Sequence, residues 1–180
     1  VDYDIEQAGI APYDLRSKHD VTDTDATHDL QWSVPESAPV LSYCVDGASY
    51  GVGMTGSGTR ETYAVQLFPA EKLAASKGMR ITHIKFGLYS VDVNSASVVI
   101  FVDKNLVYEQ EIALSDLRAI STEGYNEIRL NEPFVITADR DIMIGYHLTY
   151  ANGVKPMLFD AGPADDGYGN LLSASAGDTS

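Results

Sequence analysis

The residues best suited to chemistry lie together between Asp160 and Asn170, in the stretch DAGPADDGYGN. Its three glycines and one proline exclude a regular helix or strand, because glycine permits backbone angles closed to other residues and proline lacks an amide donor. The stretch follows the apolar run Val154–Phe159. An acidic, glycine-rich loop that joins buried segments is a place where a cation or a polar ligand can be held.

Calcium is the cation that such a loop would suit. It takes about six to eight oxygen ligands, commonly carboxylates together with backbone carbonyls. One hypothesis is therefore a structural calcium site whose side-chain ligands are Asp46, Asp160, Asp165, Asp166 and Asn170. The spacing is not that of an EF-hand. A capped turn, in which the Asp side chains accept hydrogen bonds from their own backbone amides, accounts for the same residues and is the favoured alternative.

Tyrosines form the second group of candidates, since the chain has 11 tyrosines and only 1 tryptophan. Tyr50, Tyr89 and Tyr168 fall in predicted loops or at outward-facing positions. An exposed ring can stack on a sugar while neighbouring polar groups fix the hydroxyls. These three are candidate ligand-binding residues for a glycan. The alternative is that most of the rings pack and only their hydroxyls reach water.

Catalytic patterns are weaker. Glu109 and Glu111 lie two residues apart, as some glycosidase carboxylate pairs do, but a solvated polar strand face is the favoured interpretation. Cys44 lies in an apolar segment of an acidic chain, so a buried thiol is favoured over a nucleophile activated by His83 or His147. The histidine spacing contains no zinc motif. No catalytic residue is assigned, and the chain is not expected to be an enzyme.

The charge balance excludes several classes of partner. The formal net charge is −14 and the pI is about 4.4. Such a surface repels phosphate backbones, so nucleic acid is not an expected partner. No stretch approaches the ~20 apolar residues of a membrane span, so direct membrane insertion is not expected either. Cys44 is the only cysteine, which leaves packing rather than an intrachain disulfide to stabilise the fold.

Composition also divides the chain. Residues 1–30 hold eight Asp and Glu residues against Arg16 and Lys18, and their apolar residues show no period. This segment is predicted to be an acidic linker or a loosely docked arm. Residues 31–180 are predicted to form one folded binding domain.

Alternating apolar and polar residues predict strands through most of that domain. The predicted strands span 41–45, 62–68, 79–90, 96–103, 106–113, 124–130, 141–150 and 154–159. In the segment 141–150 the even-numbered residues are predicted to face the core, and Met143, Gly145, His147 and Thr149 to face outward. Residues 47–58, which carry five glycines, are predicted to be a long flexible loop.

Local signals predict one hairpin and one helix. Asp103-Lys104-Asn105 is the expected turn between 96–103 and 106–113. Pro69, a run of good helix formers and Gly78 predict one short helix near 69–77. Since no helix alternates with the strands, the fold class is all-β. We expect an antiparallel β-sandwich of jelly-roll, galactose-binding-like type.

Several quoted segments follow one another in a recognisable order. They are LSYC (41–44), FPAEKLAASKGMRITHIKFGLY (68–89), GYNEIRLNEPFVI (124–136), DIMIGYHLTY (141–150) and FDAGPADDGYG (159–169). Over about residues 40–173 the chain resembles a β-sandwich adhesin-type module of Bacteroidetes surface and secreted proteins. It is similar in kind to the cleaved-adhesin (hemagglutinin-type) domains attached to gingipain proteases.

The resemblance implies a jelly-roll fold, a bacterial cell-surface or extracellular location, cell adhesion through carbohydrate or protein binding, and often a structural calcium. We therefore expect a non-catalytic binding module whose loops 46–60 and 160–170 meet a glycan, a host protein or a neighbouring surface protein. Two alternatives stay open: an accessory domain of a secreted hydrolase (protease or glycosidase), and a structural spacer domain.

Overall fold

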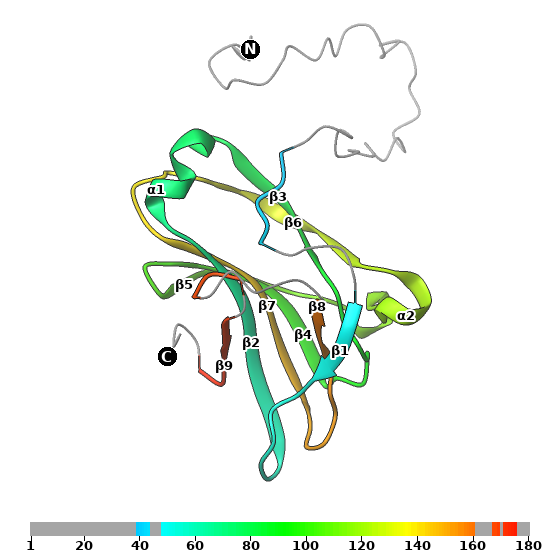
Figure 1. Ribbon diagram of the computed structural model, residues 1–180. Helices are drawn as coiled ribbons and strands as arrows, with labels where there is room; N and C mark the ends of the chain where they lie inside the picture. The colour runs from blue at the N-terminus through cyan, green and yellow to red at the C-terminus, as the bar shows by residue number, and fades with distance from the viewer. Residues whose placement is uncertain (1–38, 44–47, 161–166, 170, 176–180) are drawn as a thin grey trace, which may run out of the picture. The chain divides into compact units, whose positions relative to one another are not determined.

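The computed structural model describes residues 39–43, 48–160, 167–169 and 171–175. Contacts divide the chain into two units, residues 1–41 and residues 42–180. Only residues 39–41 of the first unit are described, so the predicted acidic arm at 1–30 lies outside the described residues. All helices and strands below belong to the second unit (Figure 1).

The described part of this unit is mostly β-structure with antiparallel pairing. Its strands are β1 (Ala48–Val52), β2 (Thr59–Phe68), β3 (Arg80–Phe86), β4 (Ser95–Val102), β5 (Asn105–Glu111), β6 (Asn126–Val135), β7 (Ile142–Ala151), β8 (Met157–Asp160) and β9 (Leu171–Ser173). Its helices are α1 (Ala70–Leu73) and α2 (Ile120–Glu123), with single 3₁₀ turns at Ala74–Ser76 and Leu114–Asp116.

The largest sheet has the strand order β5-β4-β7-β2-β9. At its centre β2 and β7 pair over their whole lengths, from Thr59 opposite Ala151 to Phe68 opposite Ile142. The predicted hairpin between β4 and β5 is confirmed. Asp103 and Lys104 have φ of 47° and 68°, the left-handed pair that a tight hairpin turn requires.

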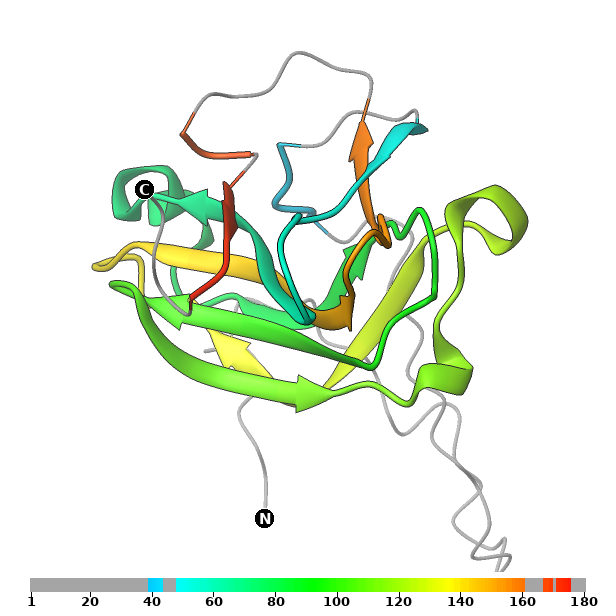
Figure 2. The same ribbon diagram turned by 90° about the horizontal axis from the view of Figure 1, so that it is seen from below.

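The remaining strands form two pairs, β3 with β6 and β1 with β8. An isolated bridge between Leu88 and Met157 joins them, and the Tyr89 amide donates to the Pro156 carbonyl over 2.8 Å. The order across these segments is thus β6, β3 with its continuation to Tyr89, β8 and β1, the last two side by side in Figure 2. The Phe86 ring stacks on Tyr146 at 4.5 Å, so β3 packs against one face of the larger sheet.

The core lies between these two sets of strands. On β7 the even-numbered residues face it as predicted, with Leu148 and Tyr150 fully buried. The buried Tyr150 hydroxyl lies 2.8 Å from Thr62 Oγ1 and accepts the Met54 amide, so this buried polar group is satisfied. The outward assignment of Met143 was wrong. It is 2% exposed, because the continuous apolar run of β4 gives the opposite face a second cluster of buried residues: Tyr63, Val65, Val99, Phe101 and Met143.

Three local predictions need correction. The glycine-rich segment 47–58 contains β1, and residues 41–43 are not a strand. The predicted strand 124–130 continues through Pro133 to Val135; proline is tolerated there because, in the described part, β6 pairs on one side only, with β3. The predicted helix near 69–77 is confirmed as α1 with its 3₁₀ extension, whereas the short helix α2 was not expected.

Candidate functional site

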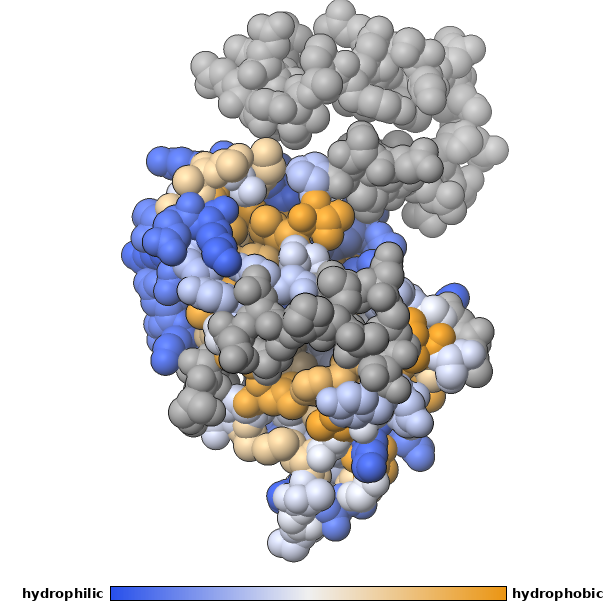
Figure 3. All heavy atoms as spheres, viewed as in Figure 1, coloured by the Kyte–Doolittle hydropathy of each residue, from blue (hydrophilic) through white to orange (hydrophobic). Residues whose placement is uncertain are grey.

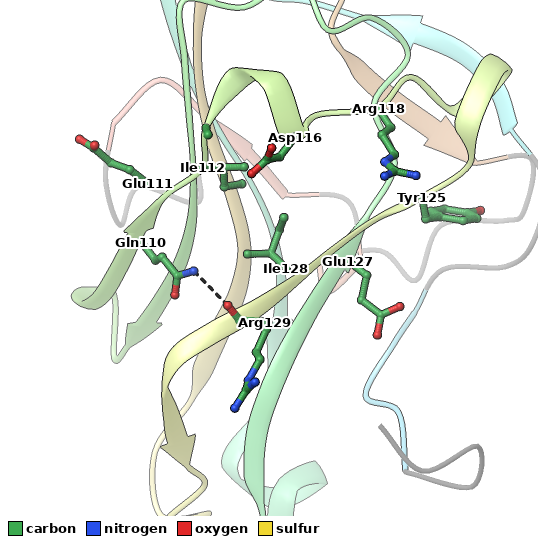
Figure 4. Close-up of a pocket in the computed structure, with 10 residues that line it drawn as sticks. Gln110, Glu111, Ile112, Asp116, Arg118, Tyr125, Glu127, Ile128 and Arg129 are labelled. Atoms are coloured by element: carbon green, nitrogen blue, oxygen red, sulfur yellow. Dashed lines mark hydrogen bonds between the residues drawn. The ribbon is translucent and has the colours of Figure 1, made fainter. Parts of the chain in front are cut away.

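A cleft with a cavity volume of about 470 Å³ opens between β5 and β6 (Figure 4). Its walls come from the end of β5, the connection 112–118 and the first half of β6. The lining residues are Gln110, Glu111, Ile112, Ala113, Asp116, Arg118, Tyr125, Glu127, Ile128 and Arg129. A hollow of this size lies within the range of small-molecule sites, about 300–1,000 Å³.

One side of the cleft is fixed by the amide of Gln110. Its Nε2 donates to the Arg129 carbonyl over 3.0 Å, and its Oε1 accepts the Asn131 amide over 2.7 Å. The Tyr108 hydroxyl donates to the same Oε1 over 2.5 Å. These bonds join the edge strand β5 of the larger sheet to β6, and they set the spacing of the two cleft walls.

The other side is fixed by Asn126, which is 2% exposed. Its Oδ1 accepts the Arg118 amide over 2.8 Å, and its Nδ2 donates to the Arg118 carbonyl over 2.9 Å. The connection from β5 is anchored once more where the Ile120 amide donates to the Leu88 carbonyl. The backbone of Arg118 is therefore held in place beside β6.

The charges of the lining nearly cancel. Glu111, Asp116 and Glu127 give −3 and Arg118 and Arg129 give +2, a sum of −1. In Figure 4 the side chains of Tyr125 and Glu127 lie on the same side of β6. Carboxylates accept hydrogen bonds and guanidinium groups donate them, so the cleft offers both kinds of partner to a ligand rich in hydroxyls.

Tyr125 gives this polar cleft an aromatic surface. Its side chain is 37% exposed, and Lys85 Nζ lies 4.9 Å from the ring centroid. Sequence reasoning missed this residue, because it placed Tyr125 in the predicted strand 124–130 without assigning the faces of that strand. Alternation along β6 was the available signal: Tyr125, Glu127 and Arg129 share one face, and two of the three are charged.

Two of the predicted tyrosines, Tyr50 and Tyr89, lie on opposite faces of β1. Tyr50 is 55% exposed and stacks on Phe159 at 5.7 Å. Tyr89 is 51% exposed, and its ring occupies the space that a side chain at Gly51 would take. Neighbouring strand residues point to opposite faces, so Tyr50 cannot share a surface with the Tyr89 ring.

The third predicted tyrosine, Tyr168, belongs to a separate cluster next to α1. Its ring lies 5.9 Å from the Tyr43 ring, and Lys72 Nζ is 4.3 Å from its centroid. The Tyr168 carbonyl accepts the Leu67 amide over 2.7 Å. These contacts attach residues 167–169 to the end of β2.

The predicted calcium site falls largely outside the described residues: Asp46, Asp165, Asp166 and Asn170 belong to the segments that the structure does not describe. Asp160 is the last residue of β8 and pairs with Ala48. Within the described ranges, no group of three or more His, Cys, Asp or Glu residues is arranged to hold a metal ion. Calcium therefore stays a prediction. Cys44 also lies outside the described residues.

A second polar cluster surrounds His147 on the opposite face of the larger sheet. Its Nε2 lies 3.0 Å from Glu61 Oε1, without hydrogen-bond geometry, and its Nδ1 lies 3.6 Å from Glu109 Oε1. Ser97 is 3% exposed, and its hydroxyl donates to Glu109 Oε1 over 2.8 Å. The same hydroxyl lies 3.4 Å from His147 Nδ1, so Ser97 contacts both a carboxylate and the histidine.

The same cluster predicts a weakness in alkaline solution. Burial raises the pKa of the Tyr63 hydroxyl, and the negative charges of Glu61 and Glu109 raise it further. The folded state therefore favours neutral Tyr63. Its contribution to stability is complete below the ordinary tyrosine pKa of about 10 and is lost as the pH rises through the folded value. We expect Tyr63→Phe to make the fall of the unfolding free energy above pH ~10 shallower.

Denaturant titrations at a series of alkaline pH values measure this slope. Tyr89→Phe, which removes a hydroxyl from a half-exposed ring, is the matched control and should keep the slope of the original protein. Equal slopes for the original protein and Tyr63→Phe would contradict the assignment.

Figure 3 shows hydrophobic residues on the visible face as separate patches among hydrophilic ones. In the part of the chain that the structure describes, no helix has both the length and the apolar character needed to cross a membrane. Comparisons with protein-family models, curated proteins and solved structures found no match for this chain, so the case for a function rests on the cleft and its surroundings.

Proposed function

We propose that residues 42–180 form a non-catalytic carbohydrate-binding module, with the cleft between β5 and β6 as its binding site. The observation that carries this proposal is the exposed ring of Tyr125 beside a cleft lined by charged and amide side chains. An aromatic ring offers its face to the C–H groups of a sugar. Polar side chains next to the aromatic ring then hydrogen-bond to the sugar hydroxyls and fix the orientation of the sugar.

The lining favours a neutral glycan over a charged ligand. A hydroxyl is both donor and acceptor, so it can bond to Glu127 and to Arg129 alike. The lining charges sum to −1, which gives a strongly anionic or cationic ligand little electrostatic advantage. The protein as a whole carries −14, which further disfavours an acidic polysaccharide.

The proposal includes an architecture and a setting. We place the fold in the antiparallel β-sandwich class of jelly-roll, galactose-binding-like type. Support comes from the packing of β3 on β7 through Phe86 and Tyr146. The resemblance to adhesin-type modules supports a role in cell adhesion at a bacterial surface or outside the cell. Such a module can also stand beside a secreted hydrolase and bring it to a glycan.

Replacement of Tyr125 tests the function directly. A glycan array first identifies which sugars the protein binds, and calorimetry then compares variants on the best of them. We expect Tyr125→Ala to weaken binding about tenfold, which corresponds to ~1.4 kcal/mol. The Tm of each variant shows whether it is folded.

Tyr50→Ala is the matched control, since Tyr50 is an even more exposed tyrosine whose ring lies away from the cleft. It should bind within about twofold of the original protein. The proposal fails if the array shows no glycan binding, or if Tyr125→Ala binds as well as Tyr50→Ala.

A further inference from the structure

Beyond the cleft, four neighbouring strand segments present one row of outward positions. Pairing across β6, β3, β8 and β1 places these positions side by side, and the adjacent residues Phe86, Leu88, Asn126 and Met157 are all buried. Because side chains alternate along a strand, the residues next to these buried ones face outward. The outward row consists of Tyr125, Gly87, Leu158 and Gly51.

The two glycines of this row are filled by neighbouring side chains. A side chain at Gly87 would meet Leu158 Cδ2 at 2.5 Å and Tyr125 Cε1 at 3.4 Å. One at Gly51 would overlap the Tyr89 ring, whose Cε1 would lie 2.8 Å away. Leu158 thus covers one glycine and Tyr89 covers the other. The result is a continuous surface from Tyr125 over Leu158 to Tyr89.

Both ends of this surface are aromatic and open to solvent. Tyr125 is 37% exposed and Tyr89 is 51% exposed, whereas Leu158 between them is partly buried. Tyr89 stands two positions beyond Gly87, which is about 7 Å along the strand. Lys85 and Glu127, paired in the next row, place polar groups at the border. An apolar strip with rings at its ends and polar groups along its border can accommodate several sugar units in line.

We infer that the glycan site extends from the cleft across this strip to Tyr89, so that its ligand is an extended neutral oligosaccharide chain rather than a single terminal sugar. The inference rests on the proposed function. Cleft residues and Tyr125 hold one part of the chain, and Tyr89 stacks on a unit further along it. Affinity therefore rises with chain length until the chain reaches Tyr89.

Calorimetry with neutral oligosaccharides tests the inference. The probes are β-1,4-glucan, β-1,4-mannan and α-1,4-glucan series, from monosaccharide to hexasaccharide. In the series that binds, we expect about a tenfold gain in affinity between disaccharide and hexasaccharide. Tyr89→Ala should remove this gain and leave disaccharide affinity unchanged, while Tyr89→Phe should retain it. Tyr125→Ala should weaken binding at every length.

The outcomes separate the two proposals. If the original protein binds every chain length equally, or if Tyr89→Ala keeps the gain with length, the extended site is wrong and the cleft stands alone. If none of the probes binds and the glycan array is also blank, both proposals are wrong. Tyr50→Ala again serves as the control, because its ring lies on the other face of β1.

Discussion

Gly145→Ala is expected to lower the free energy of unfolding by about 3 kcal/mol or more, the upper end of the range for overpacked sites. Gly145 lies in the middle of β7, opposite Val65 of β2. A β-carbon there would overlap the Ala64 carbonyl oxygen and lie 2.7 Å from the Val65 α-carbon. Both obstacles are backbone atoms of the neighbouring central strand. They cannot rotate away as a side chain could, so the strands themselves would have to separate.

A second glycine separates this steric effect from backbone strain. Gly78 has a φ of +81° and open space around its α-carbon. Gly78→Ala should therefore lower the free energy of unfolding only by the cost of holding alanine in the left-handed conformation, about 1 kcal/mol. Urea or guanidinium unfolding of both variants gives the comparison, and unchanged m-values would show that the unfolded state is the same. If Gly145→Ala costs no more than Gly78→Ala, the close approach of β2 and β7 is not as the structure has it.

The parts of the fold that sequence reasoning predicted correctly are those set by local patterns. The alternation of β7, the hairpin at Asp103-Lys104 and the helix after Pro69 each depend on residues close together in the chain. The failures arose where pairing between segments distant in sequence decides the structure. Five glycines concealed β1, since a low-propensity segment becomes a strand only when a partner such as β8 pairs with it.

The cleft was not predictable in the same way, because contacts distant in sequence build it. Gln110 reaches the backbone at Arg129 and Asn131, and no local pattern indicates that β5 and β6 lie side by side at this point. The exposure of Tyr125 and Tyr89 follows from the register that joins β6, β3 and β8. Sequence reasoning found Tyr89 through its outward position on a strand, but it had no means of pairing it with Tyr125.

The residues named for calcium are the opposite case, in which a local pattern suggested a site. Composition alone drew attention to the 160–170 loop, and only its strand residue Asp160 and the segment 167–169 fall in the described part. Tyr168, the aromatic residue of that loop, packs with Tyr43 and Lys72 rather than beside the cleft. Residues 167–169 and the cleft, whose lining carries charges of both signs, are thus separate features.

Asn126→Ala is expected to lower the free energy of unfolding by about 2–3 kcal/mol and to weaken glycan binding as well. The side chain is 2% exposed and makes both of its hydrogen bonds to the backbone of Arg118. Alanine would leave the Arg118 amide and carbonyl without these partners in a partly buried place, and each unsatisfied buried group costs about 1–3 kcal/mol. The loss also frees the connection that carries Asp116 and Arg118 into the cleft, so affinity falls even well below the Tm.

Two variants test this argument. Asn152→Ala removes an exposed asparagine whose Oδ1 accepts the Gly56 amide over 3.1 Å, and it should lower the free energy of unfolding by about 1 kcal/mol or less without changing affinity. Asn126→Asp keeps the size and the acceptor but turns a second oxygen toward the Arg118 carbonyl, so it should be at least as harmful as alanine. A mild Asn126→Asp would show that the acceptor alone holds Arg118. The amide of Asn126 would then not be the element that couples the stability of the fold to the shape of the cleft.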